Sequence, residues 1–325
     1  MTDTVLNRRE ALLGLAGTAA VAAAGSSLIT NPAEAAAPML GPLKPNLYRF
    51  KLGGFEVTTV LDGAIQLKGP HPIFGADQFE EDVAELATAN NLPADQMAIS
   101  FAPIIVNTGK ELVLFDTGNG AGRRPNAGSL RATLATAGYA PELIDVVVLT
   151  HFHPDHIGGL MEDGQPAFPN ARYVAPQAEY DFWSPEDKAG NRVGKLVQAN
   201  VVPFAEKMSF IGDGKDVVSG ITAVDASGHT PGHMAFNVES NSKRLMVTAD
   251  AANHYVVSLQ RPDWHVRFDM DKEAAANTRK KLFGMIAADK IPFTGYHMPF
   301  PNVGYVEPTG EGFRYVAAGY QMDLG

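Results

Sequence analysis

One short segment of the chain, THFHPDHIGG (residues 150–159), places three histidines and an aspartate within six positions. The chain has no cysteine, so a metal ion could be held only by imidazole, carboxylate or water, which suits zinc, manganese, iron or cobalt. His151 and His153 are two residues apart, and an extended backbone directs both rings to one side. Asp155 and His156 follow a proline turn. Four donors exceed what one ion needs from one segment, so the spacing predicts two adjacent ions.

Three further donors follow expected strands later in the chain. His229 lies in VDASGHTPGH after a β-rich run, Asp250 ends the apolar run RLMVTAD, and His297 lies in FTGYHMPF. A single residue of this kind is structural about as often as it is functional. Together with the first segment, however, they make five histidines and two carboxylates at strand ends, where open α/β folds place their ligands.

The elements that must position these side chains read as alternating strands and helices from Leu47 onward. LYRFKLGGFEVTTVLDG predicts a hairpin around Gly53-Gly54, and AISFAPIIVNTGKELVLFDTG predicts a second hairpin that turns at NTGK. The run IDVVVLTH is typical of a strand buried on both faces, and Thr150 ends it. Further strands are expected at RYVAP, ITAVDAS and RLMVTAD.

Two helices are expected outside the strands. SLRATLATAG predicts a helix with Ser129 as its N-cap and Gly138 at its C-terminal end, and KEAAANTRKKLFGMIAADK has apolar residues at helical spacing. Two layers of sheet with helices outside is the packing that these elements favour. We therefore expect a single domain over residues 47–325.

Composition narrows the classes of partner. Hydrophobic residues make up 45% and charged residues 19% of 325 residues, which is ordinary for a globular protein. The formal net charge of -10, without basic runs, argues against nucleic acid or an anionic membrane as partner and leaves a small-molecule substrate.

The first residues are typical of an export signal. Arg8 and Arg9 precede an apolar run over residues 11–24, and AEAAAP offers small residues for cleavage. We interpret residues 1–37 as a twin-arginine signal peptide, which predicts a periplasmic or secreted protein that is free of the membrane after export. The alternative is an alanine-rich helical N-terminus.

The motifs THFHPDH, SGHTPGH, TAD and GYH, in this order, resemble the metallo-β-lactamase superfamily of dinuclear hydrolases, from about Leu47 to the C-terminus. Within it, LYRFKLGGFEVTTVLDG, AFPNA, AEYDFW, GHTPGH and FPNVGYVEPTGEGFRYV resemble the methyl parathion hydrolase branch. The resemblance implies an α/β fold, the four-layer αββα sandwich, and a homodimer. True β-lactamases of the superfamily use a cysteine ligand or lack the bridging aspartate, so antibiotic hydrolysis is not expected here.

The resemblance also implies roles for individual residues. It assigns His151, His153 and His229 to one divalent ion, Asp155, His156 and His297 to the other, and Asp250 to a bridge between them, beside a water or hydroxide. Zinc is the first expectation, with manganese, cobalt or iron as alternatives. Asp155 and Asp250 are the expected catalytic residues, Asp155 also as a proton shuttle. Asp116 in LVLFDTG would orient a ligand imidazole, although a turn aspartate beside Gly118 is an equal reading. His233 is expected outside the ligand set.

The expected activity is the hydrolysis of ester, lactone or phosphotriester bonds by a metal-bridging hydroxide. A dedicated lactonase of the acyl-homoserine type is the first alternative, and a tyrosine near the metals, Tyr180 or Tyr255, would favour it. An iron-binding redox enzyme on the same fold and a non-catalytic metal-binding protein are the others.

Six residues are expected to line the substrate pocket. Trp183, with Tyr180 and Phe182, lies in AEYDFW where the related hydrolase has a pocket tryptophan, and the alternative for Trp183 is an ordinary core aromatic. Arg123 and Arg124 lie in the loop GNGAGRRPNAG, which with SPEDKAGNRVGK is expected to shape the rim. The last candidate is His254, near Asp250 in sequence.

Overall fold

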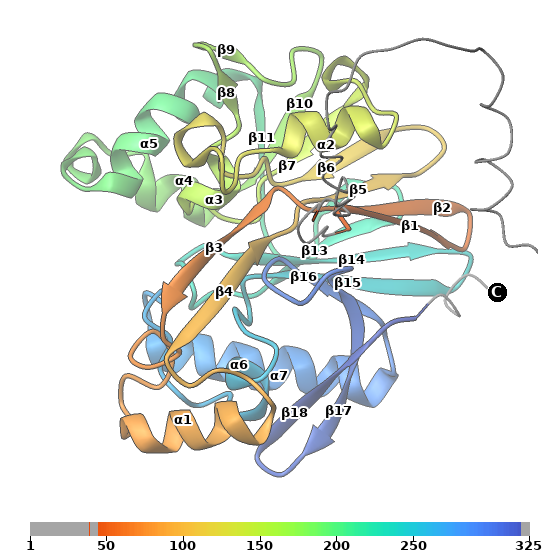
Figure 1. The fold of residues 1–325 in the computed structure, drawn as a ribbon. Coiled ribbons are helices and arrows are strands. Elements are labelled where there is room, and N and C mark those ends of the chain that lie inside the picture. The colour runs from red at the N-terminus through yellow and green to blue at the C-terminus, as the bar shows by residue number, and fades with distance from the viewer. Residues whose placement is uncertain (1–38, 40–44, 320–325) are drawn as a thin grey trace, which may run out of the picture. The chain divides into compact units, whose positions relative to one another are not determined.

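Two seven-stranded β-sheets face each other in the computed structural model, which describes residue 39 and residues 45–319 (Figure 1). In order across the first sheet lie β1 (Leu47–Leu52), β2 (Phe55–Val60), β5 (Ile104–Asn107), β6 (Leu112–Phe115), β7 (Val146–Val148), β10 (Arg172–Pro176) and β11 (Met208–Ile211). In order across the second lie β12 (Asp216–Val218), β13 (Ile221–Asp225), β14 (Met234–Ser240), β15 (Lys243–Ala249), β16 (Phe293–Gly295), β17 (Val303–Thr309) and β18 (Gly312–Ala317). Two short hairpins stand apart, β3 (Gly63–Lys68) with β4 (Gln96–Phe101) and β8 (Met161–Glu162) with β9 (Gln165–Pro166).

Helices cover the outer face of each sheet. The α-helices are α1 (Glu80–Ala89), α2 (Leu130–Thr136), α3 (Pro154–Ile157), α4 (Gln177–Trp183), α5 (Arg192–Asn200), α6 (Val257–Gln260) and α7 (Lys272–Asp289). The 3-10 helices are η1 (Ala121–Arg123), η2 (Pro141–Leu143), η3 (Glu186–Gly190) and η4 (Val202–Lys207). In Figure 1, α2, α4 and α5 lie on one side of the sheets and α7 on the other. The order helix, sheet, sheet, helix is the αββα sandwich expected from the sequence.

The strand IDVVVLTH is buried on both faces, as predicted. Val146, Val147 and Val148 of β7 have no exposed surface, and β7 runs parallel to both β6 and β10. Its side chains alternate between two cores, because Val147 packs with the outer helices while Val146 and Val148 pack between the sheets. The contact of Phe115 with Phe236, at 5.1 Å between ring centroids, joins the two sheets directly.

The last long helix, α7, forms where the spacing predicted it. The Asp271 side chain caps its first turn by accepting from Ala274 N at 3.0 Å, and the helix ends at Lys290 in the left-handed conformation. Leu282, Phe283 and Ile286 of α7 pack against the outer face of the second sheet. This contact fixes the position of α7 on the sheet, because it removes the apolar face of the helix from water.

One local prediction was confirmed in part, and another was wrong in detail. In AISFAPIIVNTGKELVLFDTG the hairpin that turns at NTGK is β5–β6, whereas β4 leaves the sheet and pairs with β3. Ser129 occupies the N-cap position of α2, but its side chain makes no capping bond. The cap is Asp62 instead, whose Oδ1 accepts from Leu130 N at 2.8 Å and Oδ2 from Gly128 N at 3.0 Å. A capping rule that considers only neighbouring residues cannot predict a cap from a carboxylate distant in sequence.

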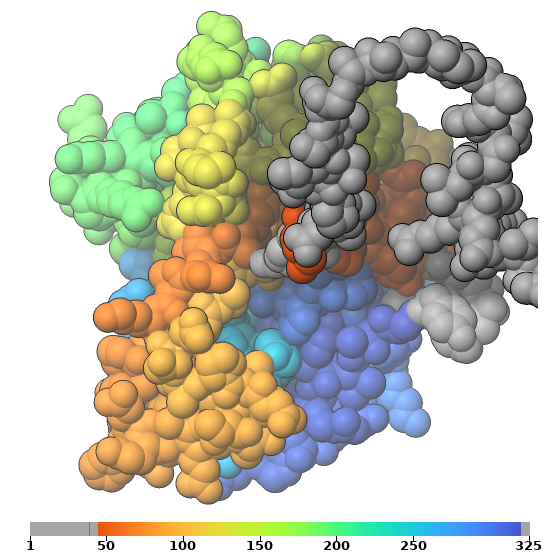
Figure 2. Space-filling model, viewed as in Figure 1, coloured from red at the N-terminus to blue at the C-terminus, as the bar shows by residue number. Residues whose placement is uncertain are grey.

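The β3–β4 hairpin extends away from the sandwich. With α1 it forms the orange part of the face seen in Figure 2. Residues 1–37, expected as a signal peptide, lie outside the described residues. Among the described residues, no helix has the length and apolar character needed to cross a bilayer.

We predict that Leu114→Ala lowers the free energy of unfolding by about 2–5 kcal/mol, because Leu114 is fully buried on β6 and its loss leaves a cavity in the outer core. Urea denaturation measures the change. Leu143→Ala is the matched control, since Leu143 is 55% exposed, and it should shift stability by less than about 0.5 kcal/mol. Equal losses in the two variants would contradict this account of the core.

Candidate metal centre

The seven expected ligands come from the ends of strands in both sheets. His151 and His153 follow β7, and Asp155 and His156 lie on the short helix α3 directly after them. His229 lies in the loop between β13 and β14, Asp250 follows β15, and His297 follows β16. Since β7, β15 and β16 each have a parallel neighbour, their carboxyl ends meet at one edge of the sandwich.

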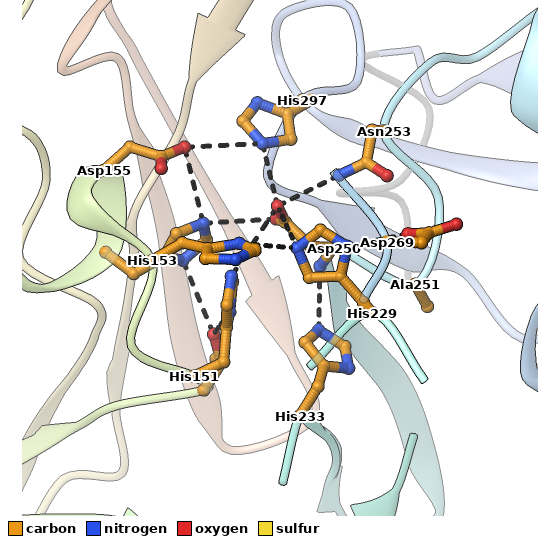
Figure 3. Close-up of polar contacts among 12 residues, drawn as sticks. His151, His153, Asp155, His229, His233, Asp250, Ala251, Asn253, Asp269 and His297 are labelled. Carbon is orange, nitrogen blue, oxygen red and sulfur yellow. Dashed lines mark hydrogen bonds and ion pairs between the residues drawn. The ribbon is translucent and has the colours of Figure 1, made fainter. Parts of the chain in front are cut away.

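The structure brings these side chains into two groups that share one residue (Figure 3). The donor atoms lie within 4.8 Å of one another in each group, the first being His151, His153, His229 and Asp250, and the second Asp155, His156, Asp250 and His297. The shared carboxylate faces both groups, with Oδ2 at 3.3 Å from His229 Nε2 and Oδ1 at 3.3 Å from His156 Nε2.

The residues present fit a pair of cations. His151 Nε2, His156 Nε2 and Asp250 Oδ1 are buried and have no hydrogen-bond partner. Buried polar atoms nearly always have a partner, and a cation held by each group would supply one. A set of nitrogen and oxygen donors with no sulfur suits zinc, manganese, cobalt or iron.

Four of the five ligand imidazoles are fixed by an oxygen on their other nitrogen. The pairs are His151 Nδ1 with Thr150 Oγ1 at 3.1 Å, His156 Nδ1 with Asp116 Oδ2 at 2.7 Å, His229 Nδ1 with Asp269 Oδ1 at 2.8 Å, and His297 Nδ1 with the Ser100 carbonyl at 2.7 Å. Such contacts set the ring orientation and the tautomer, so that the free nitrogen is directed at the cluster.

Asp116 serves this purpose from the end of β6. Besides His156, it accepts from Thr150 N at 2.8 Å and Thr150 Oγ1 at 2.9 Å, so it fixes the residue next to His151 as well. Its φ of +62° is in the left-handed region, which is unusual for a non-glycine residue and common at functional sites. Ala249, directly before Asp250, also has a positive φ of +42°.

His233 lies outside both groups. Its Nε2 accepts from Asp250 N at 3.1 Å, and its Nδ1 contacts the Ala226 carbonyl at 2.8 Å. Burial lowers the pKa of His233 to about 3, so the ring is neutral and supports the Asp250 backbone.

The protonation of the cluster is set by burial and by opposite charges. Burial lowers the pKa of His151 well below its usual value, which keeps the ring in its ligating form. Burial also lowers the pKa of His156, but Asp250 and Asp116 outweigh it and hold that pKa well above the ordinary range. Burial raises the pKa of Asp250, yet His297 and His156 hold it well below its usual value. A cation must therefore displace a proton to bind, which makes metal affinity dependent on pH.

Two buried carboxylates of this site were not found from the sequence. The first is Asp269, which contacts His229 with Oδ1 and Arg279 of α7 with Oδ2, at 3.2 Å from Nη2. Arg279 is 1% exposed and also donates to the carbonyls of Pro262 and Ala251. A buried arginine needs such partners. The pair ties the His229 loop to α7.

The second is Glu179, fully buried on α4. Its Oε1 accepts from Phe152 N at 2.9 Å and Trp183 Nε1 at 3.0 Å, and its Oε2 accepts from Gly232 N at 2.9 Å. Phe152 lies between two ligand histidines and Gly232 follows His229 in its loop, so one carboxylate holds both ligand loops. A Cβ at Gly232 would lie 2.1 Å from Glu179 N, so only glycine fits there. The only sequence signal was the spacing of Glu179 and Trp183 on one helix face.

A cavity of about 430 Å³ opens over the cluster. The second ligand group faces it through Asp155 and His297, and the β3–β4 hairpin supplies an apolar wall with Ile65, Leu67, Ile99 and Phe101. Of the six pocket residues expected from the sequence, Arg123 lines this cavity. The loop SPEDKAGNRVGK also reaches it, through Arg192 and Val193.

The structure does not bring the other five expected residues to this cavity. Trp183 is a core aromatic whose indole N–H donates to Glu179, and Phe182 packs edge-on against it. Tyr180 packs on Phe210 at 4.5 Å between centroids.

Arg124 and His254 are also held elsewhere. Arg124 pairs with Glu162 at 2.6 Å. His254 stacks on Tyr255, and both line a different cavity of about 350 Å³ between the β3–β4 hairpin and α6. Neither Tyr180 nor Tyr255 is thus available to a substrate at the cluster. Tyr296 stacks on His156, but its hydroxyl donates to the Asp155 carbonyl at 2.6 Å.

Comparison with known proteins agrees with the fold. The sequence profile of the metallo-beta-lactamase superfamily matches residues 102–289, more than half of the chain, and the chain belongs to this superfamily. N-acyl homoserine lactonases from Bacillus sp and Bacillus cereus are 28% and 26% identical over 166 and 164 residues. Each alignment covers 50% of this chain and 60% of the relative, so the chain spans little more than half the length of these curated relatives.

Two solved structures are similar over nearly their whole length. AidC, a dizinc quorum-quenching lactonase solved in complex with a product, has 26% identity and a TM-score of 0.79, with 85% of this chain and 98% of AidC covered. The hydrolase AbOPH of the beta lactamase superfamily has 25% identity and a TM-score of 0.78, with 86% and 99% covered.

We predict that zinc added to the metal-free protein raises its unfolding temperature and binds at about two ions per chain, because only the folded chain assembles both groups. Asp250→Ala, which removes the shared carboxylate, should lower both the stoichiometry and the stabilisation. Calorimetry and metal analysis test this. Asp187→Ala, at an exposed aspartate, is the control. Full zinc content in Asp250→Ala would contradict the shared-ligand geometry.

We predict that Glu179→Gln lowers the free energy of unfolding by about 1–3 kcal/mol, because an amide nitrogen would replace one of the two accepting oxygens. Since both ligand loops lose an anchor, zinc affinity should fall by roughly 10- to 100-fold. Chelator competition measures the affinity. Glu206→Gln, at an exposed position, is the control, and an unchanged zinc affinity in Glu179→Gln would disprove the anchoring role.

Proposed function

We propose that this chain is a dinuclear metal-dependent hydrolase of small-molecule esters, with lactones as its main substrates. The observation that carries the proposal is the pair of donor groups that share Asp250 beneath a cavity of about 430 Å³. The superfamily and the ligand set support a hydrolase in general. The curated relatives and AidC, all named lactonases, support the narrower substrate class.

Each ligand residue has a definable role in such a reaction. Two divalent ions, if held by these residues, would lower the pKa of a bound water and polarise the oxygen of a substrate carbonyl. Asp250 joins the two groups, because its Oδ2 lies 3.3 Å from His229 Nε2 of the first group and its two oxygens lie 3.3 Å from His156 Nε2 and 3.0 Å from His297 Nε2 of the second. Asp155 lies at the cavity, with 16% of its side chain exposed and Oδ2 at 3.6 Å from both His156 Nε2 and His297 Nε2. We assign Asp155 Oδ2 the transfer of a proton from the attacking water to the leaving oxygen, so that the proton lost on attack ends on the alcohol released.

The cavity supports a lactone more than a phosphotriester with an aryl leaving group. Trp183, which would have formed an aromatic leaving-group pocket, lies in the core. The wall from β3 and β4 offers aliphatic surface from Ile65, Leu67 and Ile99, which suits an acyl chain. A lactone also keeps its acyl and alcohol parts joined after cleavage, so a single cavity must hold the whole product.

A hydrolysis panel tests the proposal. Protein loaded with zinc, manganese or cobalt is assayed on lactones of several ring and chain sizes, on aryl esters and on dialkyl aryl phosphotriesters. We expect lactones to give the highest kcat/KM. His151→Ala should reduce turnover to background and lower the metal content, because this residue is a ligand in the first group.

His265→Ala, at a histidine outside both donor groups, is the matched control and should keep full activity. Retained turnover in His151→Ala at full metal loading would reject the assignment. Iron in the purified protein, without hydrolysis of any ester, would favour the redox alternative instead.

A further inference from the structure

Three arginines from distant parts of the chain line the cavity over the metal centre. Arg123 ends η1, Arg192 is the first residue of α5, and Arg267 lies between α6 and α7. In the described part of the chain, no carboxylate oxygen lies within 4.0 Å of any of their side-chain nitrogens. None of the three guanidinium groups is therefore paired directly with a carboxylate, although Asp155 and Asp250 line the same cavity.

Most of the other described arginines are paired. Five of these eight contact carboxylates, namely Arg124 with Glu162, Arg172 with Glu111, Arg244 with Asp289, Arg279 with Asp269 and Arg314 with Glu307. The other three, Arg49, Arg131 and Arg261, have no carboxylate partner but do not line this cavity. The chain has a net charge of -10, so acidic residues are abundant. The three arginines therefore make this cavity locally positive, whereas the net charge of the chain is negative.

Two of the three guanidinium groups lie over aromatic rings that also line the cavity. Arg123 Cζ is 5.8 Å from the centroid of Phe101, and Arg267 Cζ is 5.4 Å from that of Phe268. Contact with a ring face restrains a guanidinium plane and leaves its N–H edge free. A free, restrained edge is the geometry that binds a carboxylate with two parallel hydrogen bonds.

We propose that this cavity selects substrates that carry an anionic group, with a carboxylate as the simplest example, joined through an apolar chain or ring to the ester or lactone bond. The apolar wall would hold the body of such a molecule, and the arginines its charge. The substrate class rests on the proposed hydrolytic function, whereas anion binding rests on the arginines alone.

The test compares two esters that differ only at the end far from the nitrophenyl group, 4-nitrophenyl hydrogen suberate with its free carboxylate and its neutral methyl ester. The ratio of their kcat/KM values is measured for metal-loaded wild type and for Arg123→Gln, Arg192→Gln and Arg267→Gln. We expect the wild type to prefer the anion and each substitution to lower the ratio by roughly three- to tenfold, mainly through KM. Arg131→Gln, at an exposed arginine outside this cavity, should leave the ratio unchanged.

A binding measurement separates this inference from the proposed function. Calorimetry of octanoate with the same metal-loaded proteins needs no turnover, and affinity should fall in the three variants but not in Arg131→Gln. If the esters are hydrolysed, the ratio of their kcat/KM values tests the inference. If they are not hydrolysed, the octanoate affinity tests it. A ratio that stays at the wild-type value while hydrolysis proceeds overturns the inference and leaves the function standing. With no hydrolysis, octanoate binding that is indifferent to the arginines overturns it as well.

Discussion

The structure depends on a constraint that is unfavourable for the protein alone, namely the convergence of seven candidate ligand side chains, four buried and three partly buried, whose donor atoms face one another. His153 Nδ1 and His229 Nε2 lie 2.9 Å apart, and both oxygens of Asp250 face histidine nitrogens. Without other contacts to hold the side chains, these donor atoms would turn away from one another. The oxygens behind the rings do so, and a pair of cations between them would remove the remaining penalty.

These anchoring groups explain why the site needs the whole sandwich. Asp116 follows β6 of the first sheet, Ser100 belongs to the β3–β4 hairpin, and Asp269 is fixed by α7 on the outer face of the second sheet. Glu179 reaches from α4 to the loops of both sheets. The packing between the sheets therefore sets the distances between ligands. Loss of packing on either side would change the geometry of the metal centre.

Local pattern was enough to predict several strands, the two sheet layers and the candidate ligand motifs, because each depends on residues close in sequence. The three valines of β7 and the helical spacing of α7 are examples. Local pattern did not predict β11, β14, β17 or β18. Groups that act across the fold could not be predicted in this way. Nothing near Asp269 or Glu179 marks them as buried, since their burial is created by Arg279 and by backbone N–H groups far along the chain. That the seven donors face one another follows from the sheet packing and lies beyond any single motif.

The pocket was the least predictable part for the same physical reason. Trp183 belongs to a segment that follows the metal loop in sequence. Its indole N–H donates to Glu179, one helical turn away, and the ring is buried in the core. The wall is formed instead by a hairpin far from the metal motifs in sequence.

The charge of the protein acts on a substrate in two opposing ways. At long range, a net charge of -10 repels an anion, but this repulsion is screened beyond about 10 Å at ordinary salt concentrations. The cavity is lined by three arginines without a carboxylate partner and by Asp155 and Asp250, whose negative charge two divalent ions would outweigh. Because apolar walls limit screening there, the local attraction decides which molecules stay long enough to react. An acidic protein can in this way present a cationic site, and the sign of its net charge says little about the sign of its substrate.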